Sequence, residues 1–304
     1  MANPNASKIS LYGGIAANVA IAVSKFVAAY FTRSSAMLSE GIHSLVDSGN
    51  GILLLYGVHQ SQKPADERHP FGHSKELFFW ALIVAMLIFA IGGGMSFYEG
   101  IKHLEHPEPL TDPGWNYLVL GVSVLFETVA AVLSVRALQA GSAGSGESVW
   151  QQLRTSKDPA AFASVLENGA ALLGLLIALA GVFFGHLLDN PMLDGAASIA
   201  IGLLLMAVAV VLVARTKALL IGVGADDDTL ASIARIAQAQ PHVAQARAPL
   251  TMYLGPADVV LALDVEFADH LTADEVAATV RHLKDAIRAK HPEMKRIFIE
   301  AKAG

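Results

Sequence analysis

A histidine and an aspartate, His43 and Asp47, lie four residues apart in a predominantly apolar stretch, residues 36–58. On a helix this spacing places both side chains on one face, about one turn apart. An imidazole nitrogen and a carboxylate oxygen are ligands that suit zinc and other first-row divalent metal ions. A tetrahedral site needs two further ligands, which another helix must supply. Alternatively, the two side chains could simply pair with each other or hydrogen-bond between helices.

A second apolar stretch, residues 160–187, offers the missing ligands. Glu167 and Asn168 lie next to each other in it. A charged side chain at the middle of a membrane costs at least about 2.5 kcal/mol, so a charge in such a stretch is a functional candidate by default. Glu167, Asn168 or both could complete the site that His43 and Asp47 begin.

Four more ionisable side chains lie inside apolar stretches: Lys25, Glu40, Glu127 and Asp194. Glu127 could carry protons or hydrogen-bond between helices. Asp194 lies near the edge of its stretch, and for it we expect hydrogen bonding between helices.

The loop after residue 58 holds a second group of possible ligands. Asp66, His69 and His73 are spaced by three and four residues, and Pro70 and Gly72 prevent a regular helix between them. A turn is therefore expected to bring the histidines together. This group could be a metal site on the solvent side of the membrane, or a polar loop near the lipid headgroups.

The composition shows which elements must position these residues. Of the 304 residues 54% are hydrophobic and only 16% are charged, whereas soluble domains carry about 25% charged residues. The absence of cysteine excludes thiolate metal sites and a cysteine nucleophile. A net charge of -6 argues against a nucleic-acid-binding protein. We expect an integral membrane protein with lipid around it.

Six stretches are long and apolar enough to span a membrane as helices. They are residues 9–31, 36–58, 77–98, 117–138, 160–187 and 192–214. Lysines and arginines in the connections number nine on one side and two on the other, which places both termini in the cytoplasm. We expect the protein in a bacterial inner membrane.

The chain after residue 215 changes character and predicts a small cytoplasmic domain. A helix from residue 227 or 228 to about 240 is followed by strands at 243–254 and 259–267. A capping box of Thr272 and Glu275 starts a second helix, which ends near residue 291, and a last strand covers 296–301. The predicted fold is therefore six membrane helices (residues 1–215) followed by a ferredoxin-like α-β-β-α-β domain (residues 216–304).

Two segments together carry a family resemblance. The run from Ser34 to Asp47, SSAMLSEGIHSLVD, followed by HPFGHSKE from His69 to Glu76, resembles the cation diffusion facilitator family, and the likeness extends over nearly the whole chain. The resemblance implies a homodimeric antiporter that exchanges divalent metal cations for protons and exports them from the cytoplasm. Zinc is the first candidate; manganese, iron, cobalt, nickel and cadmium are others. No organic cofactor is implied.

The resemblance also implies ligand positions. The family pairs two residues of the second span with two of the fifth, and His43 and Asp47 match the first pair. In the fifth span Ser164 and Asn168 stand at the family's ligand positions, with Glu167 adjacent. In the cytoplasmic domain, where the family often binds metal, the matching strands offer only Asp264 and Glu300, with His242 and His270 nearby.

Two other functions are compatible with these residues. A membrane-embedded, metal-dependent hydrolase could use His43, Asp47 and Glu167, but it would need an open coordination position and a substrate pocket. A metal-sensing membrane scaffold could bind metal in its cytoplasmic tail. The sequence favours the transporter, which is not an enzyme, because buried charge in six spans would serve no purpose in an anchor.

Overall fold

A computed structural model describes residues 4–107, 113–141 and 148–302. The chain divides into two compact units. The helical unit comprises residues 1–59 and 79–216, and the α/β unit comprises residues 60–78 and 217–304. The loop that carries Asp66, His69 and His73 therefore groups with the C-terminal part of the chain.

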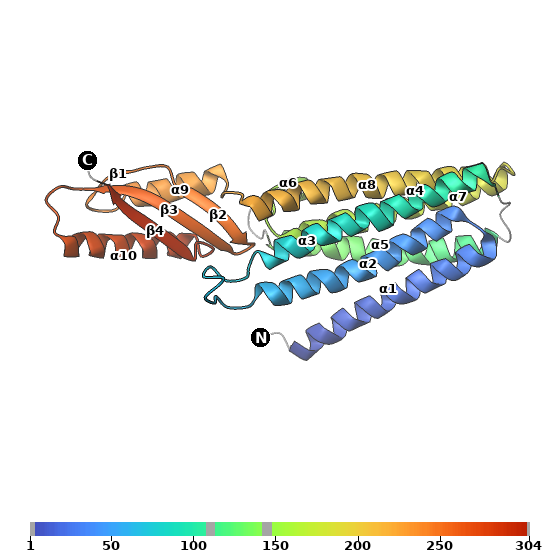
Figure 1. Cartoon of the computed structure of the whole chain (residues 1–304), viewed down its shortest axis with the longest axis horizontal. Helices are drawn as coiled ribbons and strands as arrows, with labels where there is room; N and C mark the ends of the chain where they lie inside the picture. Colours follow the sequence, from blue (N-terminus) through green and yellow to red (C-terminus); the bar gives the residue numbers. More distant parts are fainter. Residues whose placement is uncertain (1–3, 108–112, 142–147, 303–304) are drawn as a thin grey trace. The chain divides into compact units, whose positions relative to one another are not determined.

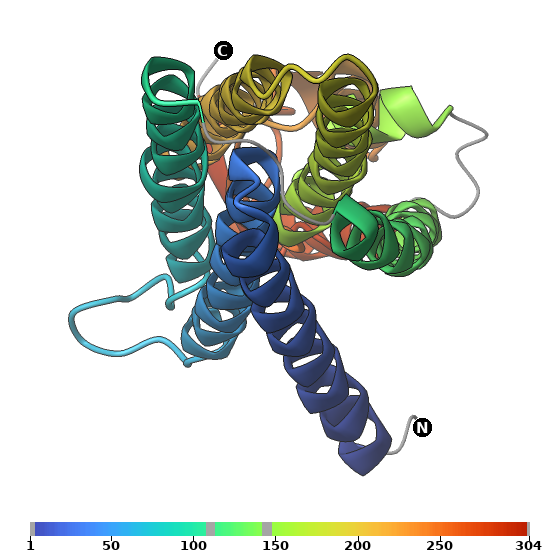
Figure 2. The same cartoon turned by 90° about the vertical axis from the view of Figure 1, so that its right-hand side faces the viewer.

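Long helices that lie alongside one another build the helical unit (Figures 1 and 2). They are α1 (Pro4–Thr32), α2 (Ser35–Ser61), α3 (Glu76–Leu87), α4 (Gly94–Glu105), α5 (Pro113–Gly141), α7 (Pro159–Leu187) and α8 (Met192–Ile221). A π-helical turn, η1 (Ile88–Gly93), joins α3 to α4 in one continuous rod. The short helix α6 (Val149–Thr155), which the sequence pattern did not predict, precedes α7.

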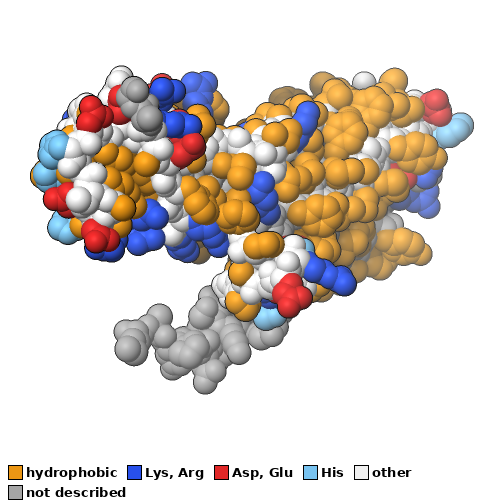
Figure 3. Space-filling model, turned by 60° about the vertical axis from the view of Figure 1, so that its left-hand side comes forward, with side chains coloured by type: hydrophobic (Ala, Val, Ile, Leu, Met, Phe, Trp, Pro, Cys, Tyr) orange, Lys and Arg blue, Asp and Glu red, His pale blue; other side chains and the backbone are white. Residues whose placement is uncertain are grey.

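Four helical rods among the described residues are long and apolar enough to cross a membrane: 76–105, 114–140, 159–187 and 192–221. The expected second span is helical too but does not meet the same criterion, and in the expected first span Asn18–Thr32 is an apolar helix. In α2 the reason is its polar content, which includes Glu40, His43, Asp47 and Asn50. Hydrophobic side chains cover most of the visible face of the helical unit (Figure 3). α2, which carries His43 and Asp47, is thus less apolar than the four rods that meet the criterion.

Asp194 of α8 fixes the start of α2. Its buried carboxylate accepts hydrogen bonds from Ser34 Oγ at 2.6 Å, Ser35 Oγ at 3.0 Å and the Ala36 backbone N–H at 3.2 Å. The first N–H groups of a helix lack partners within the helix, and a carboxylate there also suits the helix dipole. The expected hydrogen-bonding role of Asp194 between helices is confirmed.

Glycines allow η1 and α4 to approach α8 backbone to backbone. A Cβ atom added at Gly202 would lie 2.8 Å from the Gly93 carbonyl oxygen, and one added at Gly100 would lie 2.8 Å from the Gly195 carbonyl oxygen. The hydrophobic effect between helices is weak in lipid. Small residues at such crossings instead stabilise the helix pair through close packing.

The α/β unit holds a four-stranded sheet with two helices on one face. Its elements are α9 (Asp227–Gln238), β1 (Val243–Ala246), β2 (Leu250–Gly255), β3 (Asp258–Phe267), α10 (Ala273–Lys290) and β4 (Arg296–Lys302). β3 is central: β1 and β2 pair antiparallel with it, and β4 pairs parallel with it. The prediction of a single strand over residues 243–254 is wrong, because the chain leaves the sheet between β1 and β2. Pro249 lies in this break, and proline has no N–H for the ladder.

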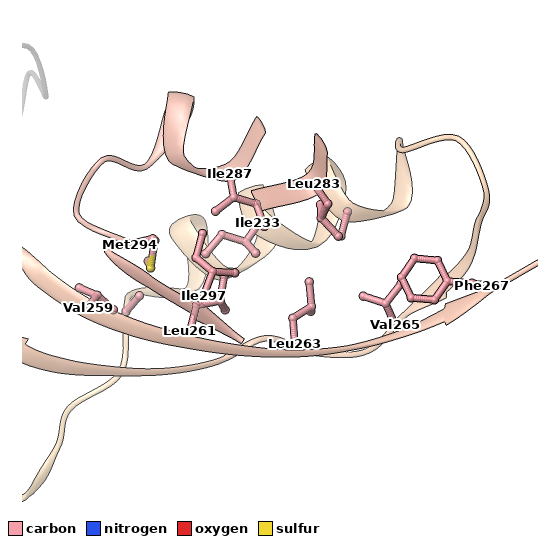
Figure 4. Packing of buried hydrophobic residues seen from close by; sticks show 12 residues of the cluster. Ile233, Val259, Leu261, Leu263, Val265, Phe267, Leu283, Ile287, Met294 and Ile297 are labelled. Carbon is pink, nitrogen blue, oxygen red and sulfur yellow. The ribbon is translucent and has the colours of Figure 1, made fainter. Parts of the chain in front are cut away.

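The core of this unit follows the two-residue period of β3. Alternate residues from Val259 to Phe267 are buried against Ile233 of α9 and against Leu283 and Ile287 of α10 (Figure 4). α10 begins with the expected capping box, in which Thr272 and Glu275 exchange side-chain to backbone hydrogen bonds. Helices on one face of an open sheet are thus confirmed for this unit.

Candidate metal site

A small cavity of about 160 Å³ lies among α1, α2, α5 and α7 of the helical unit. Its polar lining residues are Asn18, Ser44, Asp47, Glu127, Ser164, Glu167 and Asn168. The cavity therefore brings Asp47 of α2 together with Glu167 and Asn168 of α7, whereas His43 is not among its described lining residues. Among its described lining residues there is no lysine, arginine or histidine. Its wall is formally negative when the carboxyl groups are ionised.

His43 and Asp47 share one face of α2, as their spacing predicts. His43 Nε2 lies 3.3 Å from Asp47 Oδ2, and the His43 side chain is only 3% exposed. Within the described part of the chain, both His43 ring nitrogens and Asp47 Oδ1 are buried without a hydrogen-bond partner. Buried polar atoms are nearly always paired, so unpaired ones require an explanation such as an ion or a water molecule.

On α7, Glu167 and Asn168 both reach the cavity. Asn168 Nδ2 donates to the Ala130 carbonyl of α5 at 3.4 Å, which leaves its Oδ1 as the atom available to a cation. Glu167 Oε1 is buried and has no hydrogen-bond partner among the residues described. Although neighbours on a helix point about 100° apart, both side chains border the same space.

Next to the cavity lies a buried ion pair that the sequence pattern left without a role. Lys25 Nζ of α1 donates to Glu40 Oε2 at 3.0 Å and to Ser44 Oγ at 2.8 Å, and both charged side chains are fully buried. A Cβ atom on Gly174 of α7 would lie 2.5 Å from Glu40 Oε1. Any larger residue at position 174 would displace the glutamate. The pair therefore fixes α1 and α7 against α2, one turn from His43.

The loop in the α/β unit brings its three candidate ligands together. One ligand atom each of Asp66, His69 and His73 lies within 4.8 Å of the other two. His69 Nδ1 is 3.1 Å and His73 Nε2 is 3.5 Å from the Asp66 carboxylate. His73 Nδ1 is 3.1 Å from the Pro64 carbonyl. If it donates there, the neutral ring presents the lone pair of Nε2 toward the aspartate, as metal-ligating histidines do.

Hydrogen bonding lowers the pKa of Asp66. The largest cause is the bond from the His69 backbone N–H, at 2.6 Å; the His69 side chain and the Arg68 backbone N–H add to it. A carboxylate that accepts such bonds is stabilised in its charged form. The charged form, which is the form that binds a metal ion, is therefore favoured at Asp66.

The same loop is fastened to the sheet of its unit. Arg296 of β4 donates to the Phe71 carbonyl at 2.8 Å and forms an ion pair with Asp258 of β3. Ser74 Oγ donates to the same Asp258 at 3.0 Å. Arg296 and Asp258 therefore attach the loop to strands β4 and β3 through Phe71 and Ser74. This arrangement could not be inferred from the local sequence.

The strand residues Asp264 and Glu300 face each other across the β3–β4 pair, but a lysine occupies the space between them. Lys302 Nζ lies 2.5 Å from Glu300 Oε1 and 4.0 Å from Asp264 Oδ2. The bond to Glu300 raises the pKa of Lys302, so the lysine stays charged. The nearby rings of His242 and His270 are 6.3 Å apart. A metal ion at Asp264 and Glu300 would have to displace this ammonium group.

Glu127 is the residue whose placement the sequence pattern missed. Its charge inside an apolar stretch marked it as a candidate, but nothing in the pattern indicated which face of α5 would turn inward. It lines the same cavity as Asp47 and Glu167.

Comparison with known proteins finds a likeness to metal cation transporters. The family model described as the cation efflux transmembrane domain matches residues 11–221. The mitochondrial proton-coupled zinc antiporter SLC30A9 of Xenopus laevis is 28% identical over 313 residues, which cover 91% of this chain and 56% of that protein. Metal tolerance protein C4 of Arabidopsis thaliana is 33% identical over 209 residues (69% of this chain, 46% of that protein). The cation-efflux pump FieF of Escherichia coli is 36% identical over 124 residues (38% and 41%). The chain thus spans about half the length of these relatives.

Proposed function

Because the chain belongs to the cation diffusion facilitator family of metal cation transporters, we propose that it is a proton-coupled exporter of divalent transition-metal ions, with zinc as its first substrate. It is an integral membrane transporter rather than an enzyme. The observation that carries the proposal is the cavity of the helical unit, where Asp47 and Glu167 hold buried oxygen atoms without partners and His43 lies 3.3 Å from Asp47. Manganese, iron, cobalt, nickel and cadmium are further candidate substrates.

The transport site consists of His43 and Asp47 of α2 together with Glu167 and Asn168 of α7. One imidazole, two carboxylates and one amide oxygen make a four-ligand set that suits zinc. Two negative charges balance the ion in a region of low dielectric.

Proton coupling follows from competition for the same atoms. Metal ions bind the deprotonated forms of imidazole and carboxylate, so metal binding releases protons and protonation releases metal. His43, as the imidazole of the set, takes part in this competition.

The membrane arrangement is part of the proposal. Six helical rods cross the membrane: α1, α2, the α3–η1–α4 rod, α5, α7 and α8. The distribution of lysine and arginine supports placing both termini in the cytoplasm of a bacterial cell. Residues 216–304 form a cytoplasmic domain through which two copies pair as a homodimer.

The alternatives have less support. A hydrolase is set aside because the chain belongs to a family of transporters. A sensor that binds metal through Asp264 and Glu300 is disfavoured because Lys302 neutralises these acids.

Metal uptake by proteoliposomes tests the proposal. Vesicles containing the purified protein and a metal-sensitive dye are exposed to each divalent ion with and without a pH gradient. We expect zinc to accumulate, and a gradient to accelerate it. A wild-type protein that moves none of the six metals, whatever the gradient, would refute the function.

A comparison of two α7 variants tests how the site is completed. Glu167→Gln removes one of the two charges that balance the ion, and we expect it to weaken zinc binding by about 100-fold, or about 2.8 kcal/mol. Asn168→Ala removes a neutral ligand, for which we expect about a tenfold effect, or about 1.4 kcal/mol. Ser164→Ala, on the same cavity wall, is measured beside them, and we expect it to weaken binding much less than Glu167→Gln does. Wild-type affinity in both Glu167→Gln and Asn168→Ala would place the site on a different face of α7.

We further propose that Asp66, His69 and His73 bind a metal ion in the loop. Cobalt absorption in an Asp47→Asn background isolates this site from the transport site. Because the pKa of Asp66 is lowered, its carboxylate stays charged to a lower pH than an ordinary aspartate does, and its contribution is lost only when the pH falls below that depressed value.

Protonation of a ligand releases the metal ion, so we expect cobalt binding to weaken as the pH falls. We expect His73→Ala to abolish the cobalt signal. Asp66→Asn should lower the affinity without changing the shape of the pH profile. A cobalt signal that survives in both variants would show that this loop holds no metal.

A further inference from the structure

The cavity at the proposed transport site has a third carboxylate that the four-ligand set does not use. Asp47 of α2, Glu127 of α5 and Glu167 of α7 line one space of about 160 Å³. A cavity of this size accommodates an ion with several water molecules. Carboxylates from three helices thus face the same small volume.

No basic side chain in the described lining of the cavity pairs with the Glu127 carboxylate. The lysine closest to the site, Lys25, is already held by Glu40 and Ser44. No basic side chain belongs to the described lining of the cavity. A glutamate inside an apolar helix carries a large desolvation cost unless something in the site compensates it.

The unpaired atoms next to it indicate what compensates the charge. Both ring nitrogens of the buried His43, Asp47 Oδ1 and Glu167 Oε1 have no hydrogen-bond partner within the described residues. Carboxylate oxygens without partners on one cavity wall, with an imidazole 3.3 Å from one of these carboxylates, form a donor set that suits a cation.

We propose that Glu127 is a further ligand of the transported ion, so that the site draws on α2, α5 and α7 together. The inference rests on the proposed transport function and concerns which metal ions the site accepts. Zinc is satisfied by four ligands, whereas manganese prefers about six, mainly oxygen. A third carboxylate makes the site rich in oxygen and admits manganese beside zinc.

Equilibrium binding of zinc and of manganese to the full-length protein in nanodiscs tests this. Glu127→Gln preserves the shape of the side chain but removes its charge. We expect manganese affinity to fall at least about tenfold, and zinc affinity to fall by less than about threefold. The neighbouring Thr128 bonds to the Val124 carbonyl of its own helix and does not line this cavity, so Thr128→Val is the matched control and should bind both ions as the wild type does.

A second variant separates ligation from long-range charge. Glu127→Asp keeps the charge but withdraws the carboxylate by one methylene, and ligand distances must hold within about 0.2 Å. We expect it to lose manganese affinity as well. Unchanged manganese binding in Glu127→Gln, or an equal loss of both metals, would overturn the inference, as would wild-type manganese binding in Glu127→Asp.

An Asp47→Asn variant measured alongside reports on the site itself. If it binds both ions like the wild type, the proposed transport site is wrong. If it loses them while Glu127→Gln does not, only the role of Glu127 fails.

Discussion

Replacing Asp47 with asparagine is expected to abolish metal transport while the protein remains folded. The change preserves the size of the side chain but removes a charge that directly balances the divalent ion. We expect zinc flux into proteoliposomes to fall by about 100-fold or more, which corresponds to at least about 2.8 kcal/mol of lost ion binding. His43→Ala should have a similar effect, because it removes the nitrogen ligand of the site.

A neighbouring substitution serves as the control. Ser48 lies on α2 close to Asp47, is buried, and donates its hydroxyl hydrogen to the Ser44 carbonyl of its own helix. Ser48→Ala therefore alters the same helix without touching the described lining of the cavity. Wild-type flux in Asp47→Asn would show that the ion binds elsewhere. Equal loss in Ser48→Ala would show that any change in α2 inactivates the protein.

The second large effect concerns stability. Lys25→Met is expected to destabilise the helical unit by about 3–5 kcal/mol, because it leaves the Glu40 carboxylate buried without its counter-ion. Methionine fills a volume similar to that of the lysine stem, so lost packing contributes little. Thermal unfolding in detergent, followed by circular dichroism, measures the change.

The double variant Lys25→Met/Glu40→Gln distinguishes the loss of the whole ion pair from the loss of one partner. With both charges gone, no uncompensated charge is left, and replacing a whole buried pair is often nearly neutral. We expect most of the lost stability to return. A Lys25→Met protein that melts like the wild type, or a double variant less stable than Lys25→Met, would mean that this pair does not hold α1 against α2.

Local periodicity predicted the parts of the site that lie on one element. The four-residue spacing of His43 and Asp47 determined their shared face, and the turn residues Pro70 and Gly72 indicated that the loop histidines converge. The capping box of α10 was readable for the same reason, since Thr272 and Glu275 interact within one helical turn. These features depend on residues close together in the sequence.

Features that depend on packing between distant elements could not be predicted. Which face of α5 turns inward, and hence whether Glu127 reaches the cavity, depends on how α5 packs along α7. The same holds for Lys25, whose partner lies on another helix, and for Lys302, whose position beside Asp264 follows from strand register. The strand break at Pro249 could have been predicted from the sequence, because proline has no N–H for the ladder. The alternating pattern around it nevertheless resembles one continuous strand.

The most direct test of the account follows zinc and protons together in one vesicle. Proteoliposomes carrying a zinc-sensitive dye and a pH-sensitive dye receive a pulse of external zinc, with wild-type protein or with Asp47→Asn. The account predicts that zinc entry through the wild type is matched in time by proton exit, and that Asp47→Asn shows neither signal. Zinc entry without proton movement, or equal signals from the two proteins, would contradict it.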